Sequence, residues 1–271
     1  MGRNEIIAPK LLKVKPPPEY PPEEGRYLRG NDYSPVAVVG ILDTFDFKIP
    51  PELVRLIGVA IESGAALAGT LQTENIGLEK LVANVVANPN IRYIVLCWRE
   101  SQGHLPGDAL MALVKNGVRK DKRRTIIGAE ALTPYLPNIS LAAIERFRKQ
   151  ITIVNLLSEG NSKIGMYPET VRKAIWSCFQ ENPTKFMGYT LHDPGAYSEP
   201  PICHKITMRI TEPWRPVISE EEAKIIEGIK KSVRAREKED RKRKEPTLLE
   251  LLGIEKINKK QSKKNNSQNG L

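Results

Sequence analysis

Between residues 35 and 157 the chain alternates short apolar runs with longer amphipathic segments. Runs such as "PVAVVGIL" are apolar at consecutive positions, which is typical of strands buried on both faces of a parallel sheet. The longer segments repeat apolar residues every three or four positions, which is the period of a helix. We expect strands over 35–42, 91–97, 124–130 and 151–157, and helices over 51–69, 77–88, 107–117 and 140–150.

This alternation predicts an α/β fold: a Rossmann-like, mostly parallel sheet with helices on both faces. Such sheets bind ligands in the crevice beyond the carboxyl ends of their strands. Two loops are expected at that edge, residues 98–107 and residues 128–138. Candidate binding residues should therefore be sought there first.

The segments around this domain, which we place at 25–160, have different compositions. A helix is expected over 166–182 and a strand within 195–217, and Ser219 with Glu222 forms a capping box that opens a charged helix. The flanking parts are a Pro-rich arm (1–24), an α+β extension (161–218), a charged helical segment (219–257) and a disordered basic tail (258–271).

The net charge of +10 is concentrated in the C-terminal part of the chain. Residues 228–271 hold 14 Lys+Arg and 6 Asp+Glu, so the rest of the chain is close to neutral. This segment could bind a nucleic acid or an acidic protein, or serve only as a solvated charged helix. The charge therefore says little about the function of the main domain.

Several classes of protein are excluded or disfavoured. The three cysteines are far apart and form no C-x-x-C pair, which argues against a zinc ribbon or an iron–sulfur cluster and suits a reducing cytoplasm. The N-terminus lacks the apolar core of a signal peptide, and no run of about 18 apolar residues occurs. We therefore expect a soluble, cytoplasmic protein, and no set of residues supports a hydrolase.

The segment "QGHLPG" carries the first candidate site. Gln102, His104 and Gly107 are spaced as in the D-x-H-x-x-G loop of many cobalamin proteins, with Gln in place of Asp. An imidazole is a good ligand for cobalt, and a polar side chain two residues earlier could orient the ring. Glycine lets backbone approach a flat macrocycle. The alternative is a histidine that hydrogen bonds merely hold in a loop.

The segment "TENIG" carries the second candidate site. Thr73, Glu74 and Asn75 can cap the helix that follows while free amides face a ligand. Glu74 would repel a phosphate, and no P-loop sequence occurs anywhere in the chain. An ordinary helix cap is the alternative interpretation.

Together these blocks resemble a known family. "EGRYLRGNDYSPVAVV", "AGTLQTENIGLEKLVANVVANPNIRYIVLC", "SQGHLPG", "KRRTIIGAEALTPYLPNI" and "ERFRKQITIVNLL" are similar, in this order, to the cobamide-carrying A subunit of tetrahydromethanopterin S-methyltransferase. The resemblance covers about Gly25 to Leu157.

The resemblance implies a Rossmann-like domain that holds a cobamide (5-hydroxybenzimidazolylcobamide or a related corrinoid), with His104 as the axial cobalt ligand. It also implies partner subunits of a methyl-tetrahydropterin-dependent methyltransferase. In this archaeal methanogenesis complex, a methyl group passes from methyl-tetrahydromethanopterin to cobalt and then to coenzyme M. The cofactor-binding residues that we expect are His104, Gln102, Gly103, Gly107, Thr73, Glu74, Asn75, Gly77, Gly128 and Pro134. We expect no catalytic residue.

This chain departs from the family pattern at several positions. Its C-terminal part is charged where the membrane-bound subunit has a transmembrane helix, which suggests a soluble homologue. Trp98 and Arg99 replace small residues, and Pro106 and Asp108 stand where a hydroxyl residue and an amide are expected. Bulky residues could narrow the corrinoid cleft, so the alternative is a binding or regulatory module that kept the fold and lost the corrinoid.

Overall fold

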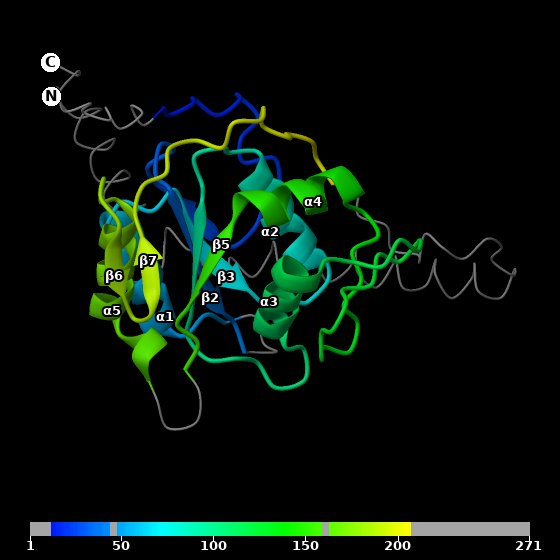
Figure 1. The fold of residues 1–271 in the computed structure, drawn as a ribbon. Helices are drawn as coiled ribbons and strands as arrows, with labels where there is room; N and C mark the ends of the chain where they lie inside the picture. The colour runs from blue at the N-terminus through cyan, green and yellow to red at the C-terminus, as the bar shows by residue number, and fades with distance from the viewer. Residues whose placement is uncertain (1–11, 44–47, 159–162, 207–271) are drawn as a thin grey trace, which may run out of the picture.

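The computed structural model describes residues 12–43, 48–158 and 163–206. Their centre is a five-stranded sheet in the order β1-β3-β2-β4-β5 (Figure 1). The strands β2 to β5 are parallel, and β1 pairs antiparallel with β3, so the expected mostly parallel sheet is confirmed. The strands are β1 (Tyr27–Arg29), β2 (Val36–Ile41), β3 (Leu67–Leu71), β4 (Tyr93–Cys97) and β5 (Thr152–Asn155). The expectations for the charged helix at Ser219 and the tail fall outside the described residues.

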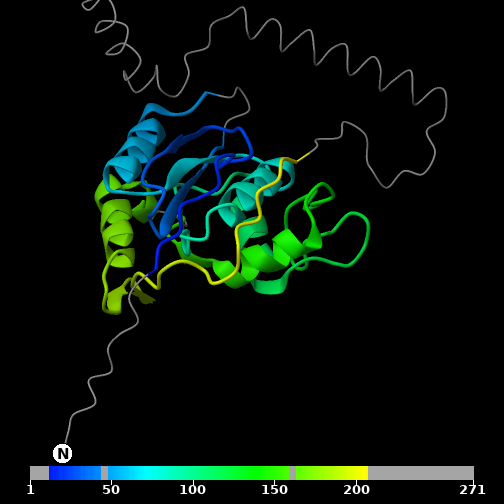
Figure 2. The same ribbon diagram turned by 90° about the horizontal axis from the view of Figure 1, so that it is seen from above.

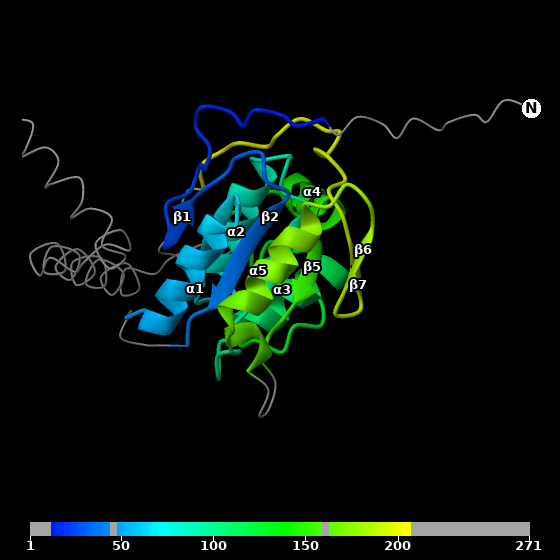
Figure 3. The same cartoon turned by 90° about the vertical axis from the view of Figure 1, so that its left-hand side faces the viewer.

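Helices cover both faces of this sheet, which forms the middle layer of three (Figure 2). The helices α1 (Pro51–Glu62) and α5 (Pro168–Cys178) pack together on one face (Figure 3). The other face carries α2 (Ile76–Val86), α3 (Pro106–Asn116) and α4 (Leu141–Gln150). A 3-10 turn (Ile164–Met166) precedes α5, and a hairpin of β6 (Thr184–Phe186) and β7 (Tyr189–Leu191) follows it.

The apolar pattern explains these layers. Every residue of β2 and β4 is buried, because helices cover both faces of the two central strands. From α1, Leu53, Leu56 and Ile57 are fully buried on one side of the sheet, and Leu78 and Val82 of α2 are fully buried on the other. Each such side chain contributes about 1.5–3 kcal/mol relative to an exposed position.

The helix predicted over 51–69 is wrong in its second half. The helix α1 ends at Glu62, where Gly64 takes a φ of +102° that a helix does not allow. Residues 67–71 instead form β3, which pairs with β1 on one side and β2 on the other. A β-carbon at Gly69 would lie 2.5 Å from the carbonyl oxygen of Arg26. Small residues are therefore required here, and a run of small residues hides the period that separates helix from strand.

The strand predicted over 124–130 is also wrong. Thr125 and Ile126 each make one isolated bridge, with Tyr135 and Val118, and no residue of the segment joins the sheet. Positive φ values at Arg124 and Gly128 interrupt the extended backbone. The apolar residues anchor a loop between α3 and α4, with Ile126 buried.

Residues 195–206, the described part of the strand predicted within 195–217, form no strand. They run beside the N-terminal arm at the amino ends of the parallel strands (Figures 1 and 2). Ala196 N–H donates to Leu12 O at 2.7 Å, and Tyr197 N–H donates to Pro89 O at 2.8 Å. This segment closes the sheet's amino edge instead of extending the sheet sideways.

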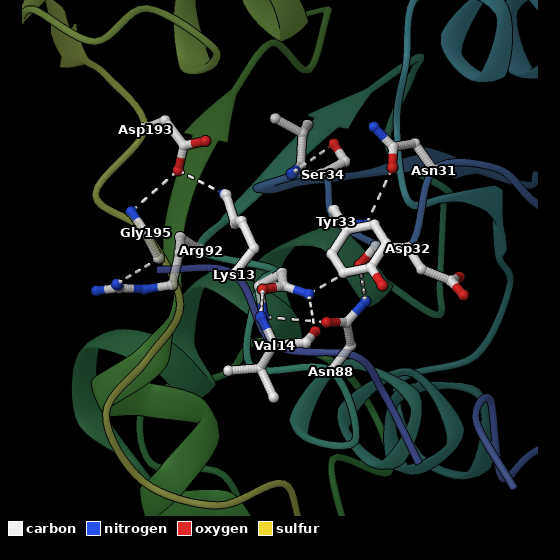
Figure 4. Close-up of polar contacts among 12 residues, drawn as sticks. Lys13, Val14, Asn31, Asp32, Tyr33, Ser34, Asn88, Arg92, Asp193 and Gly195 are labelled. Carbon is white, nitrogen blue, oxygen red and sulfur yellow. Dashed lines mark hydrogen bonds and ion pairs between the residues drawn. The ribbon is translucent and has the colours of Figure 1, made fainter. Parts of the chain in front are cut away.

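Polar side chains join these segments at the amino edge (Figure 4). Asn90 accepts a hydrogen bond from Val14 N–H at 2.9 Å and donates to Val14 O at 2.6 Å, while Asn88 donates to Asp32 O at 2.9 Å. Lys13 pairs with Asp193 at 2.6 Å. The polar side chains of the amino edge therefore bind other segments of the same chain.

The opposite, carboxyl edge is where the topology leaves room for a ligand. From β2 the chain crosses to β3 on one side and then returns to β4 on the other, and ligands collect where such crossovers diverge. The loop after β3 holds Glu74, and the loop after β4 holds His104. The two loops therefore lie at the same edge of the sheet.

Candidate functional site

His104 and Glu74 are in direct contact at the carboxyl edge. The Nδ1 atom of His104 lies 2.9 Å from Oε2 of Glu74. The Glu74 side chain is fully buried, whereas 43% of the His104 side chain is exposed. An ionised carboxylate only accepts hydrogen bonds, so Nδ1 is the donor of this contact, and in the neutral tautomer that donates from Nδ1 the ring's lone pair lies on Nε2. The pair thus holds a part-exposed imidazole at the carboxyl edge through its Nδ1 atom.

The second oxygen of Glu74 binds a different loop. Its Oε1 accepts hydrogen bonds from Thr133 N–H at 3.1 Å and from Thr133 Oγ1 at 2.6 Å. Burial alone would raise the pKa of Glu74, but the hydrogen bonds from Thr133 and His104 outweigh it and hold that pKa below its ordinary value. Glu74 is therefore ionised at neutral pH and connects His104 to the 128–138 loop.

A second carboxylate, that of Glu100, binds backbone amides at both ends of the His104 loop. Glu100 accepts hydrogen bonds from the backbone N–H groups of Ser101, Gly107 and Asp108 at 2.9, 3.2 and 2.8 Å. The last two are orphan donors of the first turn of α3, where a negative charge is favourable. A β-carbon at Gly107 would lie 2.4 Å from Glu100 Oε2, so this glycine makes room for the carboxylate and not for a macrocycle. Burial raises the pKa of Glu100.

Glu79 makes a third tie, between α2 and the segment before α4. Its two oxygens accept from Asn138 N–H at 2.6 Å and Asn138 Nδ2 at 2.9 Å. Burial raises the pKa of this carboxyl group. Sequence reasoning assigned no role to Glu79 or Glu100. Glu79 lies inside a block that resembles the family, and Glu100 directly precedes another.

The structure brings some of the expected site residues together. Thr73 Oγ1 accepts from Gly77 N–H at 2.9 Å and Asn75 Oδ1 accepts from Ile76 N–H at 2.7 Å, so the helix-cap interpretation is confirmed for both. Pro134 follows Thr133 and is buried, with its carbonyl oxygen accepting from Ile126 N–H at 2.9 Å. Thr73 and Asn75 flank Glu74 in the sequence, and Pro134 adjoins Thr133, which binds the same carboxylate.

Other expected residues lie elsewhere or play another part. Gln102 is exposed, and the partner of the His104 ring is Glu74 instead of this side chain. Gly103 adjoins His104, has a φ of +100° and has open space where a β-carbon would stand. Gly128 lies beside Asn116, at the opposite end of α3 from His104.

Three of the residues that depart from the family pattern are held by contacts within the fold. Trp98 is 5% exposed and lies in the core cluster on the face of α1 and α5, away from His104. Pro106 occupies the first position of α3, where proline is favoured. Asp108 accepts from Glu130 N–H at 2.7 Å and so ties α3 to the 128–138 loop. Arg99 is exposed.

Two wider features bear on what the site can hold. In ranges 12–43, 48–158 and 163–206, no three His, Cys, Asp or Glu side chains gather in a way that could hold a metal ion. In the same ranges, no helix combines the length and the apolar character required to cross a membrane. His104 with Glu74 has the chemistry to supply one ligand to a metal, together with a carboxylate that orients the ring.

Comparison with known proteins identifies the family. The sequence model for the A subunit of tetrahydromethanopterin S-methyltransferase (MtrA) matches residues 13–212. The A 1 subunit of this enzyme from Methanothermobacter thermautotrophicus is 36% identical over 197 residues, which cover 72% of this chain and 71% of the relative. The A 2 subunit from Methanothermobacter marburgensis is 38% identical (73% and 91% covered), and the A subunit from Methanopyrus kandleri is 40% identical over 190 residues (70% and 67%). The chain belongs to the MtrA family, the A subunits of tetrahydromethanopterin S-methyltransferase.

Proposed function

We propose that this chain is the corrinoid-carrying subunit of a cytoplasmic methyl-transfer system, with His104 as the axial ligand to cobalt. One observation carries the proposal: a buried, ionised carboxylate holds Nδ1 of an imidazole that is 43% exposed at the ligand-binding edge of the sheet. Membership of the family supports a cobamide as the cofactor and the other subunits of such a methyltransferase as partners.

The donor set fits a corrinoid. A corrinoid brings four equatorial nitrogen ligands of its own, so the protein needs to supply one axial ligand, and a neutral imidazole suits cobalt. The carboxylate on the far ring nitrogen orients the ring and raises its basicity. Gly103 leaves open space beside His104, where a β-carbon would meet no atom within 4 Å.

The residues of the chain place and tune the cofactor. When bound, the corrinoid would supply the cobalt that takes a methyl group from methyl-tetrahydromethanopterin and passes it to the thiol of coenzyme M. Glu74 keeps the proton of His104 on Nδ1, so that Nε2 can donate its lone pair without a proton transfer. Glu100 fixes the start of α3 and therefore the end of the His104 loop.

The test is the visible spectrum of the full chain reconstituted with hydroxocobalamin. We expect His104→Ala to lose the imidazole-ligated spectrum, and Glu74→Gln to keep the ligand but bind the corrinoid about 10- to 100-fold more weakly. His204→Ala removes an exposed histidine of the 195–206 segment at the amino edge; it is the matched control and should keep the wild-type spectrum. His104→Ala should also lower the free energy of unfolding by about 1–2 kcal/mol, because it leaves one oxygen of the buried Glu74 carboxylate without its imidazole partner.

A spectrum that does not change in His104→Ala would refute the proposed ligation. If the wild-type chain retains no corrinoid through gel filtration, the chain is a binding or regulatory module of the same fold instead.

A further inference from the structure

The loop between α3 and α4, residues 117–140, begins with a concentration of positive charge. Residues 115–124 hold six Lys+Arg and one Asp, whereas residues 1–227 taken together are close to neutral. In Figure 2 this green loop forms the right-hand end of the described fold. The loop is therefore a basic projection from a domain that carries little net charge of its own.

Backbone hydrogen bonds hold the basic part of the loop in one conformation. Arg119 N–H donates to Thr125 O at 2.8 Å, which closes a turn whose tip is residues 120–124. Leu136 N–H donates to Arg123 O at 3.0 Å, which braces that tip against the second half of the loop. A surface whose backbone is already ordered loses little conformational entropy when it binds a partner.

Most of the cations at this turn face solvent. Arg124 is half-buried and donates to Pro137 O, so its role is to hold the turn. The exposed cations are Arg119, Lys120, Lys122 and Arg123. Like charges on so short a turn repel one another, and Asp121 is the one acidic residue within 115–124. A partner that brings carboxylates to the turn would offset this repulsion.

The same loop exposes apolar side chains as it approaches the His104 site. Ile127 is 41% exposed and Leu132 is 74% exposed. Leu132 directly precedes Thr133, whose hydroxyl binds the carboxylate that holds His104. An exposed aliphatic side chain of this size suits an apolar hollow on the surface of another protein. The loop thus joins a basic turn to an apolar contact close to the proposed site.

These features favour a protein partner over a polyanion such as an anionic membrane or a nucleic acid. Asp121 lies among the cations, and Glu130 is exposed two residues before Leu132. A uniformly negative surface repels both acids, whereas a protein can place an opposite charge against each. Tyr135 is the one aromatic residue of the loop, and it is half-buried with the Arg123 guanidinium 5.3 Å from its ring centre. The loop therefore exposes no ring on which bases could stack.

We infer that the 117–140 loop is the docking surface for a partner protein that presents carboxylates to Lys120 and Lys122 and an apolar hollow to Leu132. The inference rests on the proposed function, because the partner is a subunit that exchanges the methyl group at the His104 edge. It deepens that function by naming the surface of this chain that the subunit contacts and the charge that the subunit carries there.

The test measures the affinity of the corrinoid-loaded full chain for the other subunits of the methyltransferase from the same organism. We expect Lys120→Glu/Lys122→Glu to weaken binding about tenfold or more, because each reversal turns an attraction into a repulsion. Leu132→Ser should weaken binding about fivefold or more through the lost apolar contact. Raising the salt from about 0.05 M to about 0.5 M should weaken binding of the wild type more than that of the charge variant.

Carbodiimide cross-linking tests the chemistry of the contact, because this reagent joins a lysine amine only to a carboxylate that touches it. We expect mass spectrometry to find Lys120 or Lys122 joined to an Asp or Glu of one of those subunits. Cross-links that involve only lysines outside the loop would overturn the inference.

Lys173→Glu/Lys185→Glu is the matched control, because it makes the same change of charge at two exposed lysines of α5 and β6. It should bind the subunits as the wild type does. If Lys120→Glu/Lys122→Glu also binds like the wild type while both retain the corrinoid, the inference is wrong and the proposed function stands.

Vesicles of an anionic lipid and a single-stranded RNA are measured in parallel. If the charge variant loses affinity only for one of these, the turn serves a polyanion and the inference is wrong. If the wild-type chain retains no corrinoid, the proposed function fails and takes the inference with it.

Discussion

The two edges of the parallel sheet are both lined with buried polar side chains, but those side chains serve different ends. At the amino edge, Gln150 Nε2 donates to the backbone oxygens of Val85, Asn88 and Ile91 at 3.2, 3.0 and 2.9 Å. Gln150 Oε1 in turn accepts from Arg146 Nε at 2.9 Å. Every one of these groups finds its partner inside the chain, and Gln150 is 2% exposed.

At the carboxyl edge the buried groups support an exposed one. Glu74 is fully buried, yet one of its partners is an imidazole that is 43% exposed. Buried polar networks that close on themselves stabilise a fold, whereas under the proposed function the buried carboxylate of this edge orients the group that binds the ligand. Two blocks that resemble the family therefore differ in role. Residues 88–92 (N-P-N-I-R) belong to the closed network of the amino edge, whereas residues 102–104 (Q-G-H) carry the histidine of the proposed site.

The largest loss of stability is expected from a substitution at the amino edge. Gln150→Ala removes the donor for three backbone carbonyl groups and the acceptor for Arg146, so the free energy of unfolding should fall by about 3–4 kcal/mol. Urea unfolding measures this loss. Gln102→Ala, which truncates an exposed glutamine, should stay within about 0.5 kcal/mol of the wild type. A loss below about 1 kcal/mol in Gln150→Ala would contradict the structural role of this edge.

A smaller loss of stability is expected from a change at the start of α3, the helix that follows the His104 loop. Glu100→Ala leaves two amides of the first turn of α3 without their acceptor and should cost about 2 kcal/mol. Hydrogen exchange should speed up at the amides of Gly107 and Asp108 in particular. Glu130→Ala changes an exposed side chain and serves as the control. Unchanged exchange at both amides would show that Glu100 does not hold this turn.

The smallest effect depends on pH and isolates Glu74. The pKa of this carboxyl group is lowered in the folded state, so its stabilisation is complete above its ordinary pKa of 4.5 and is lost as pH falls through the folded-state pKa. The pKa values of Glu79 and Glu100 are raised, so these two groups change the stability with pH in the opposite direction. They do so equally in the wild type and in Glu74→Gln, and their contribution therefore cancels when the two proteins are compared.

The wild type should therefore lose about 1 kcal/mol more stability than Glu74→Gln between pH 7 and pH 3. Unfolding in urea at the two pH values measures the difference. Equal losses in the two proteins would show that Glu74 is not ionised in a stabilising environment.

The sequence predicted the parallel sheet and the position of His104, because both follow from local apolar patterns and from strand polarity. It did not predict β3, because "AALAG" is too small in side-chain size to show either period. It misread 124–130, where Ile126 is buried and anchors a loop while Ile127 is exposed. Nor could it pair Glu74 with Thr133, 59 residues away, since an acidic residue in a loop looks the same whether solvated or buried.

The shared carboxylate has a thermodynamic consequence. Glu74 binds His104 through one oxygen and Thr133 through the other, so the strength of one contact depends on the other. Linkage of this kind is reciprocal: any ligand that strengthens the imidazole contact must change the free energy of holding the Thr133 segment by the same amount. A protein that docks on residues 128–138 and a metal that docks on Nε2 would therefore influence each other's affinity without ever touching.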